Sequence, residues 1–549
     1  MQTIINMFSV HGTFVQPDAL EYILSKKDPH GYCECIVQSL SEYPMVLSIE
    51  LLRSLETPLV DETPQSKPST DEKALQAHIL SKLLSHTPLK QKDEEENDEE
   101  GDEDTYEITY ENEHNMNPLP TISSPDTWHP ASKDYDSDIR IIKDITGNST
   151  CEGTTQDFVK LFASRFDVLR KQLRTQRREL ANVIPISRMK RSGLKDIQLI
   201  GIVNDIRTTQ NGNRLLELED DTGTVTAIVL QSNRDVFLSA QSIVSDEIIG
   251  IVGQMSKKGD LFLVNSVIFP DISLHNRKHV AAEPVYAAFL SDIHVGSKEF
   301  MDKQWFAFLK WINGALGNTR QKTVAGKIKY LVVPGDIVDG IGIYPNQEKE
   351  LSIIDLYKQY ETLAEYFTRI PEHISIILQP GNHDAVRPAE PQPTFDKAIQ
   401  KLFSSNDVTF VANPSYFSLH NVEILSYHGS SLLDYATNIQ HLQYNEPVEI
   451  MKVMLQKRHL APMYGGYTPL APEHIDYMII DQIPDIFVTG HVHLATLGEY
   501  RGVTLINASS WQAQTGYQKM LNFIPDPAKL PIVDLQSGKV TMMDFTRII

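Results

Sequence analysis

Aspartate and histidine side chains follow five apolar segments in the C-terminal half of the chain, at the point where each segment ends. The five motifs are, in chain order, Asp292-Ile293-His294, Gly335-Asp336-Ile337-Val338-Asp339, Gly381-Asn382-His383-Asp384, His428-Gly429 and Gly490-His491-Val492-His493. The apolar segments are typical of buried β-strands, and in open α/β sheets ligands bind at the carboxyl ends of the strands. We therefore expect these polar side chains to meet at the carboxyl edge of a sheet.

The residue types indicate a catalytic cation site. Carboxylate oxygens and imidazole nitrogens suit Mn²⁺, Fe and Zn²⁺, and the absence of cysteine from the motifs argues against a structural zinc site. In Asp-x-His and His-x-His, side chains two residues apart can face the same side of an extended segment and reach a common centre. The candidate ligands are Asp292, His294, Asp336, Asn382, His428, His491 and His493.

Two cations are favoured over one because the carboxylate of Asp336 has two oxygens, which can bridge ions roughly 3.5–4 Å apart. Asn382 adds a neutral carbonyl oxygen, and glycines at 335, 381, 429 and 490 permit sharp turns and close backbone approach. A single Asp-x-His or His-x-His motif has a simpler explanation, since buried histidines are more often only hydrogen-bonded. Five such motifs in this order favour the metal site.

The ordered motifs resemble the calcineurin-like metallophosphoesterase superfamily over about residues 284–520. The resemblance implies that one ion is bound by Asp292, His294, Asp336 and His493, and the other by Asp336, Asn382, His428 and His491. It also implies that His383 protonates the leaving group or stabilises the transition state, with Asp384 orienting its imidazole. Asp339 is expected to support the ligands from outside and not to bind an ion itself.

The elements that must position these motifs predict an α/β and β multidomain protein. By the resemblance, residues 279–549 are expected to form the phosphoesterase domain, an α/β/β/α sandwich. Residues 195–278 resemble an OB-fold of five short strands separated by turns. Phe262 and Phe269 are expected in the core of this barrel, so packing against the next domain is favoured over base stacking.

Residues 151–194 are predicted to be a basic helical connector. Apolar residues at spacings of three and four lie on one helical face, namely Phe158, Phe162, Phe166, Leu169 and Leu173. Cations crowd the same helix at Arg170, Lys171, Arg174, Arg177 and Arg178. Contact with phosphates and a solvated helix face are equally good explanations of this charge.

Two N-terminal regions complete the predicted organisation. Residues 1–58 are interpreted as a small helical domain that binds a partner, and residues 59–150 as an acidic disordered linker. The linker contains DEEENDEEGDED at 93–104, which cannot bury enough apolar surface to fold. A solvated spacer is favoured over docking on a basic partner.

The whole sequence points to an intracellular protein. No segment approaches the roughly 18 consecutive apolar residues of a membrane span, and the N-terminus lacks the pattern of a secretory signal. Three cysteines in 549 residues cannot form a disulfide framework. The net charge of −22 is unevenly distributed, so it excludes no nucleic-acid partner. We expect a cytoplasmic protein without membrane association.

Two segments make the resemblance specific to one family within this superfamily. QPGNHDAVRPAEPQP and NASSWQAQTGYQKMLNFIPDPAKLP, with the order of domains, resemble the small subunits of archaeal family-D DNA polymerases. This resemblance implies a proofreading 3′→5′ exonuclease that acts on DNA 3′ ends, associates with the nucleoid, and forms a heterodimer with a large catalytic polymerase subunit. Eukaryotic B-subunits share the layout but have lost metal ligands, whereas none is missing here.

The expected cofactor is two divalent ions, with Mn²⁺ favoured and Mg²⁺, Fe or Zn²⁺ as alternatives. The alternative functions are a stand-alone nuclease of the double-strand-break-repair type, a phosphatase, and an inactive scaffold between a polymerase and its sliding clamp. Clamp binding stays open, because the C-terminal VTMMDFTRII is predicted to complete a β-strand.

Three further residues are predicted to contact the substrate. Arg387, just after the Gly-Asn-His-Asp motif, is predicted to contact a substrate phosphate, with a salt bridge to Glu390 as the alternative. His459 and Tyr464 lie between the fourth and fifth motifs and are predicted to line a substrate channel.

Overall fold

The computed structural model describes residues 128–191, 196–274, 276 and 278–547, together with 14–15, 22–23, 26, 32–33 and 46–47. The chain divides into two units, Met1–Thr70 with Gln514–Ile524, and Asp71–Ala513 with Pro525–Ile549. The first unit contains the parallel strands β1 (Phe14–Val15) and β2 (Val46–Leu47) and helix α14 (Gly516–Met520). Most of the predicted helical domain 1–58, and residues 59–127 of the predicted linker, lie outside the described residues.

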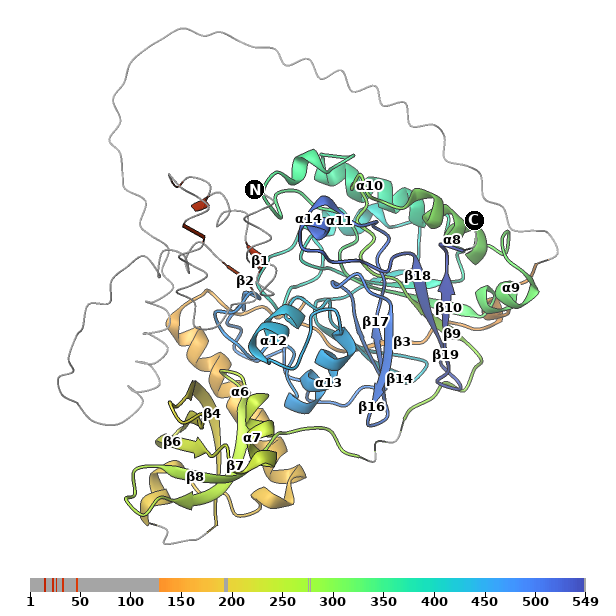
Figure 1. Cartoon of the computed structure of the whole chain (residues 1–549). Coiled ribbons are helices and arrows are strands. Elements are labelled where there is room, and N and C mark those ends of the chain that lie inside the picture. The colour runs from red at the N-terminus through yellow and green to blue at the C-terminus, as the bar shows by residue number, and fades with distance from the viewer. Residues whose placement is uncertain are drawn as a thin grey trace. The chain divides into compact units, whose positions relative to one another are not determined.

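The second unit contains two six-stranded sheets and a closed barrel (Figure 1). The first sheet has the order β12 (Val408–Phe410), β11 (Ser375–Gln379), β10 (Ile328–Pro334), β9 (Tyr286–Phe289), β18 (Lys529–Asp534) and β19 (Val540–Asp544). The second has the order β16 (Thr496–Tyr500), β17 (Val503–Asn507), β15 (Ile486–Thr489), β14 (Val422–Ser426), β13 (Ser415–Leu419) and β3 (Ile139–Lys143).

The central strand β10 is buried on both faces, which explains its continuous apolar run. Leu331 and Val333 pack into the core shared with helices α8 (Asp302–Ile312), α10 (Leu356–Phe367) and α11 (Lys397–Leu402). Tyr330 and Val332 point to the opposite face and pack between the two sheets, against residues of β13, β14 and β15. The alternation of side chains along one strand thus joins both layers of the core.

Further helices and turns complete the second unit. Helices α12 (Leu432–Asn438) and α13 (Pro447–Lys457) pack together, and α13 contacts β16 and β17. The remaining short elements are η1 (Ala131–Asp134), α9 (Thr319–Ala325) and η4 (Gln347–Lys349). The predicted C-terminal strand is confirmed over Val540–Asp544, which form β19.

One part of the linker prediction is wrong. Residues 139–143 form β3, which pairs in antiparallel register with β13 at the edge of the second sheet. The acidic run biased the prediction for the whole tract, whereas Ile139 packs against the core between the sheets. One edge of this sheet is therefore supplied by residues far from its other strands in the sequence.

The barrel consists of β4 (Ile197–Thr208), β5 (Arg214–Asp220), β6 (Gly223–Val229), β7 (Ile248–Met255) and β8 (Phe262–Ile268), closed in the order β4-β5-β6-β8-β7. Helix α7 (Arg234–Gln241) follows β6, and η2 (Arg178–Leu180) and η3 (Ile186–Arg191) precede the barrel. Phe262 and Phe269 are both buried in its core, as predicted. They are therefore not available as a platform for bases.

The predicted helical connector is confirmed as α6 (Thr155–Gln176), which begins at a capping box formed by Thr154 and Asp157. Its apolar face packs against β4, β7 and η2. Two of the five cations predicted on it have carboxylate partners: Arg170 lies 2.7 Å from Asp167, and Arg177, just after the helix, lies 3.5 Å from Asp271. Part of the basic charge is thus neutralised within the fold.

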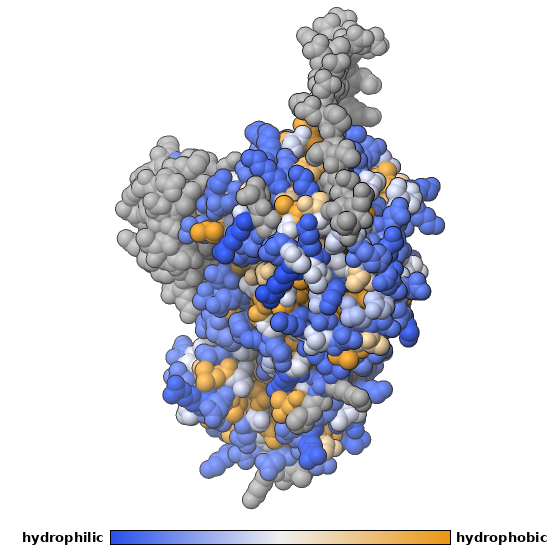
Figure 2. Space-filling view, turned by 90° about the vertical axis from the view of Figure 1, so that its right-hand side faces the viewer, coloured by the Kyte–Doolittle hydropathy of each residue, from blue (hydrophilic) through white to orange (hydrophobic). Residues whose placement is uncertain are grey.

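Apolar side chains reach the molecular surface in small patches separated by polar ones, on the face shown in Figure 2. Within the described part of the chain, no helix combines the length and the hydropathy needed to cross a bilayer.

A buried ion pair ties the barrel to helix α13. Lys457 Nζ lies 2.6 Å from Glu247 Oε2, and the two side chains are 0% and 2% exposed. Burial lowers the pKa of Lys457 and raises that of Glu247, and their mutual attraction opposes both shifts. Each charge therefore depends on the other for its ionisation.

Replacing Lys457 with Met should destabilise the chain by about 3–5 kcal/mol, because Glu247 would stay buried without its partner. The measurement is the urea midpoint of unfolding. The matched control is Lys452→Met on the same helix, which breaks the more exposed Lys452–Glu449 pair and should change the midpoint little. Equal effects of the two variants would contradict the role of the buried pair.

Candidate metal centre

The structure brings together all seven predicted ligands, Asp292, His294, Asp336, Asn382, His428, His491 and His493, which we call the cage. Asp292 and His294 follow β9, Asp336 follows β10, and Asn382 follows β11 of the first sheet. The histidines at 428, 491 and 493 follow β14 and β15 of the second sheet. The ligands therefore follow the carboxyl ends of neighbouring parallel strands, as expected, but these strands belong to two sheets and not to the single sheet that the sequence predicted.

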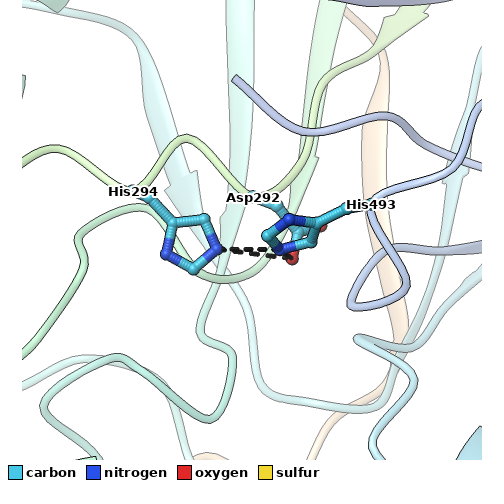
Figure 3. Close-up of side chains that lie close together, drawn as sticks. All are labelled: Asp292, His294 and His493. Atoms are coloured by element: carbon cyan, nitrogen blue, oxygen red, sulfur yellow. Dashed lines mark hydrogen bonds and ion pairs between the residues drawn. The ribbon is translucent and has the colours of Figure 1, made fainter. Parts of the chain in front are cut away.

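One group of ligand atoms is formed by Asp292, His294 and His493 (Figure 3). The Nε2 atoms of the two histidines are 3.0 Å apart, and the carboxylate oxygen Oδ1 of Asp292 lies 3.4 Å from His493 Nε2 and 3.9 Å from His294 Nε2. Two imidazole nitrogens and a carboxylate oxygen thus face one point. This donor set suits a divalent transition-metal ion.

A second group surrounds His428. Its Nε2 lies 3.2 Å from Asp336 Oδ2, 2.9 Å from Asn382 Oδ1 and 3.3 Å from His491 Nδ1. The same Asp336 oxygen lies 3.9 Å from His294 Nε2 in the first group. Asp336 is therefore the carboxylate common to both groups, which is the position that a bridging ligand requires.

The electrostatics of the cage keep its carboxylates ionised although they are buried. Burial alone would raise the pKa of Asp292 and Asp336, but the neighbouring histidines lower both values overall. Burial likewise disfavours the charge on His428, yet Asp336 raises its pKa to about 10. Burial and the charge on His428 lower the pKa of His491 to about 3. The cage thus combines ionised carboxylates with the neutral imidazole of His491, whose Nδ1 lies 3.3 Å from His428 Nε2.

The backbone at the cage is strained. Five of its ligands have positive φ angles: 51° at Asp292, 53° at His294, 49° at Asp336, 68° at His491 and 58° at His493. Such conformations cost about 1–3 kcal/mol each for residues with side chains, and they cluster at functional sites. The fold maintains the arrangement of these side chains against local preference.

Three of the predicted glycines are required by close approach. A Cβ atom at Gly381 would lie 2.2 Å from Asp336 Oδ1, and one at Gly335 would lie 2.5 Å from His428 Nδ1. A Cβ at Gly490 would lie 2.0 Å from Ser291 Oγ and 2.5 Å from Asp292 Oδ2. Any side chain at these positions would displace a cage ligand or its neighbour.

The outer ring nitrogens of the cage are held by fixed acceptors. His294 Nδ1 lies 3.0 Å from Asp339 Oδ1, and His428 Nδ1 lies 2.8 Å from the carbonyl oxygen of Pro334. Asp339 is held in turn by the amides of Gln512, at 2.9 Å, and Gln347, at 3.3 Å. Asp339 thus supports the cage from outside, as expected. No role was predicted for Gln347 or Gln512 from the sequence, although Gln512 lies within the C-terminal signature that begins NASSWQAQ.

His383 lies at the open side of the cage, with its side chain 17% exposed. Its Nδ1 lies 2.8 Å from the backbone carbonyl oxygen of Asp339, and its Nε2 lies 4.0 Å from Asp336 Oδ2. Because Nδ1 donates to a fixed carbonyl, Nε2 is directed toward the ligands. The predicted location of His383 is therefore consistent with proton transfer at the cage.

The orienting role predicted for Asp384 is wrong. Its carboxylate accepts hydrogen bonds from the backbone N–H of Gly381 at 2.8 Å and of Ile337 at 3.3 Å, and from the Tyr360 hydroxyl at 3.2 Å. The turn places Asp384 behind the loop, where it fixes the backbone, and the Asp339 carbonyl orients His383 instead. Burial and the charge on Asp336 raise the pKa of Asp384 to about 7.

The prediction for Arg387 is wrong in both of its forms. The guanidinium forms a salt bridge of 2.8 Å with Glu473 and donates to the carbonyl oxygen of Pro391 at 2.9 Å. Glu390 is buried and accepts hydrogen bonds from Tyr427 and Ser430. Arg387 therefore stabilises the loop that follows the third motif. Its guanidinium is engaged in these contacts and not directed to a substrate phosphate.

His459 and Tyr464 do not line a channel at the cage. His459 is 1% exposed and its Nε2 lies 2.9 Å from Asp476, which also forms a 2.7 Å salt bridge with Arg165 of α6. The ring of Tyr464 packs edge-on against Phe158, with the ring centroids 4.8 Å apart. Both residues belong to the contact between α6 and the segment that follows α13.

The chain is similar to several known proteins. The family model for the DNA polymerase alpha/epsilon B subunit matches residues 287–497. The DNA polymerase II small subunit of Archaeoglobus fulgidus is 43% identical over 409 residues, which cover 74% of this chain and 80% of the relative. The corresponding small subunits of Methanocaldococcus jannaschii and Methanothermobacter thermautotrophicus are each 41% identical, covering 77% and 76% of this chain and 71% and 84% of the relatives.

The chain belongs to the family of archaeal DNA polymerase II small subunits. The family model overlaps all seven cage residues, because it begins before Asp292 and ends after His493. The cage thus lies in the part of this small subunit that the wider family shares.

Addition of Mn²⁺ should raise the thermal unfolding midpoint of this small subunit, because a ligand that binds only the folded state stabilises it by about 2.7 kcal/mol at one hundred times its Kd. Asp336→Asn should abolish the rise, since this residue lies in both groups of ligands. Glu361→Gln, an exposed carboxylate on α10 that pairs with Lys358, serves as the control and should behave like the wild type. An undiminished rise in the Asp336→Asn variant would refute the ligand assignment.

Proposed function

We propose that this small subunit is a metal-dependent 3′→5′ exonuclease, which hydrolyses phosphodiester bonds at DNA 3′ ends to proofread for a replicative polymerase. The observation that supports it most is the complete cage, in which seven donor groups from both sheets converge around Asp336. A purely structural subunit has no chemical need for this strained and buried set of ligands. Membership of a polymerase small-subunit family supports DNA as the substrate.

The fold supports the same proposal. Two facing sheets with helices against the first sheet and α13 against the second agree with a calcineurin-like sandwich. The five-stranded closed barrel agrees with an OB-fold, and its buried Phe262 and Phe269 favour a docking role over base stacking.

Two divalent ions, with Mn²⁺ favoured, would be held by Asp292, His294, Asp336 and His493 and by Asp336, Asn382, His428 and His491. When bound, they supply Lewis-acid polarisation of the phosphate and lower the pKa of a coordinated water. Residues of the chain orient the substrate and supply the proton. The cage orients the scissile phosphate in a buried setting, and His383 Nε2 provides the proton to the departing 3′-oxygen while the Asp339 carbonyl holds its Nδ1.

Replacing His383 with Ala should lower the rate of nucleotide release by about 10²- to 10⁴-fold, because it removes the proton donor but no cage ligand. The measurement is the shortening of a 5′-labelled oligonucleotide in the presence of Mn²⁺. The Mn²⁺-dependent rise in unfolding midpoint should persist in this variant, which separates loss of chemistry from loss of the ions. His441→Ala, at an exposed histidine, is the control.

Full activity of the His383→Ala variant would refute the assigned role of this residue. Absence of any Mn²⁺-dependent shortening by the wild type would refute the exonuclease and favour the inactive scaffold.

The proposed partner is a large catalytic polymerase subunit, because the relatives are named as small subunits. We place the assembly in the cytoplasm at the nucleoid, with sliding-clamp binding still to be tested. Affinity purification of this chain from its own cells should recover a larger polypeptide with polymerase activity in equal molar amount. Recovery of the chain alone at native concentration would contradict the heterodimer.

A further inference from the structure

The turn that follows Asp339 presents two apolar side chains to solvent. Ile341 is 45% exposed and Ile343 is 38% exposed, in the sequence Gly-Ile-Gly-Ile-Tyr at 340–344. Gly340 and Gly342 both have positive φ angles, 73° and 74°, which give the turn its shape. Together the exposed parts of the two isoleucines offer an apolar surface beside the proposed catalytic cage, of the kind that a ligand with an apolar face can cover.

Two buried glutamines hold this turn rigidly. Gln347 accepts a hydrogen bond from the N–H of Ile343 at 2.9 Å and donates to the carbonyl oxygen of Asp339 at 2.8 Å. Gln359 accepts from the N–H of Gly340 at 2.9 Å and donates to its carbonyl oxygen at 3.1 Å. Both glutamine side chains are fully buried. The turn is therefore pre-organised, and a ligand that binds it need not order the loop.

The turn lies directly against His383. A Cβ atom at Gly340 would be 2.3 Å from the carbonyl oxygen of His383 and 3.3 Å from Cδ1 of Ile343. Both Ile343 Cδ1 and the His383 carbonyl oxygen therefore border the space beside Gly340.

The direction of the proposed reaction decides what lies on this side of the cage. Attack of water on phosphorus forms a new P–O bond and breaks the bond between phosphorus and the 3′-oxygen of the penultimate nucleotide. The terminal nucleotide leaves as a 5′-monophosphate, and the penultimate 3′-oxygen takes a proton from His383. The penultimate nucleoside must therefore lie beside His383, whose Nδ1 is held by the Asp339 carbonyl at the start of the turn.

We propose that Ile341 and Ile343 form a shelf that binds the unpaired nucleobase of the penultimate nucleotide. This inference rests on the proposed exonuclease activity and names the substrate that it selects. A nucleobase has a flat apolar face that packs on such side chains without regard to sequence. A base cannot pack there while it is paired and stacked in a duplex, so the shelf selects ends with at least two unpaired nucleotides.

The experiment uses the full chain with Mn²⁺ and three single-stranded oligonucleotides of one sequence. One is unmodified, one has an abasic tetrahydrofuran residue at the penultimate position, and one has it at the terminal position. For the wild type, the penultimate abasic residue should raise KM about tenfold, at the lower end of the range for base stacking, while the terminal one has little effect. Ile341→Ser/Ile343→Ser should raise KM for the unmodified strand to the value for the penultimate abasic strand.

Two further variants make the result specific. Ile343→Phe should lower KM for the unmodified strand, because an aromatic ring packs better on a base. Leu238→Ser, at an exposed apolar residue of α7 in the barrel, should leave all three KM values unchanged. Equal KM values of the wild type for all three strands, or a penultimate effect that survives in the double serine variant, would overturn the shelf. Hydrolysis of none of the three would instead overturn the exonuclease on which the shelf rests.

Discussion

The carboxylate of Asp336 lies between two sets of buried ring nitrogens, and the strands and loops of the second unit hold it in this position. It follows the central strand β10, whose neighbours on both sides supply the adjacent ligands of the first sheet. Its Oδ1 accepts a hydrogen bond from the backbone N–H of His383 at 2.9 Å. The other oxygen, Oδ2, faces His428 and His294. The charge on this one residue therefore links the two ligand groups and the proposed proton donor.

The surrounding structure offsets the cost of this arrangement. Buried carboxylates and left-handed backbone conformations are unfavourable, but the sheets that carry them are covered by a large apolar core on one face and packed together on the other. Glycines at 335, 381 and 490 let the backbone of one loop approach the ligand of the next. Asp384 and Asp339, although outside the cage, fix the two loops that bear His383 and His294.

The sequence predicted the cage well because its signal is local. Each motif follows an apolar strand, and parallel strands end at the same edge of a sheet, so the grouping of ligands within each sheet followed from topology. The meeting of the two sheets at one cage did not follow from that rule. The spacing of apolar residues is also a local signal, and it predicted the apolar face of α6, the barrel strands and the core position of Phe262.

Contacts between residues distant in sequence were not predictable in this way. Arg387 meets Glu473, and His459 meets Asp476, through loops whose paths the sequence does not specify. Asp384 follows His383 directly, yet the turn directs its carboxylate to Gly381 and Tyr360. Strand β3 lay next to an acidic tract, and only its pairing with β13 shows that it belongs to the sheet. These errors share one cause, because side-chain partners depend on packing and not on spacing.

The most direct test of the central claim is anomalous X-ray scattering at the manganese edge from crystals of the full chain grown with Mn²⁺. The account predicts two peaks, one among Asp292, His294 and His493 and one among Asn382, His428 and His491, with Asp336 between them. A map with no peak at the cage, or with ions bound only elsewhere, would contradict it.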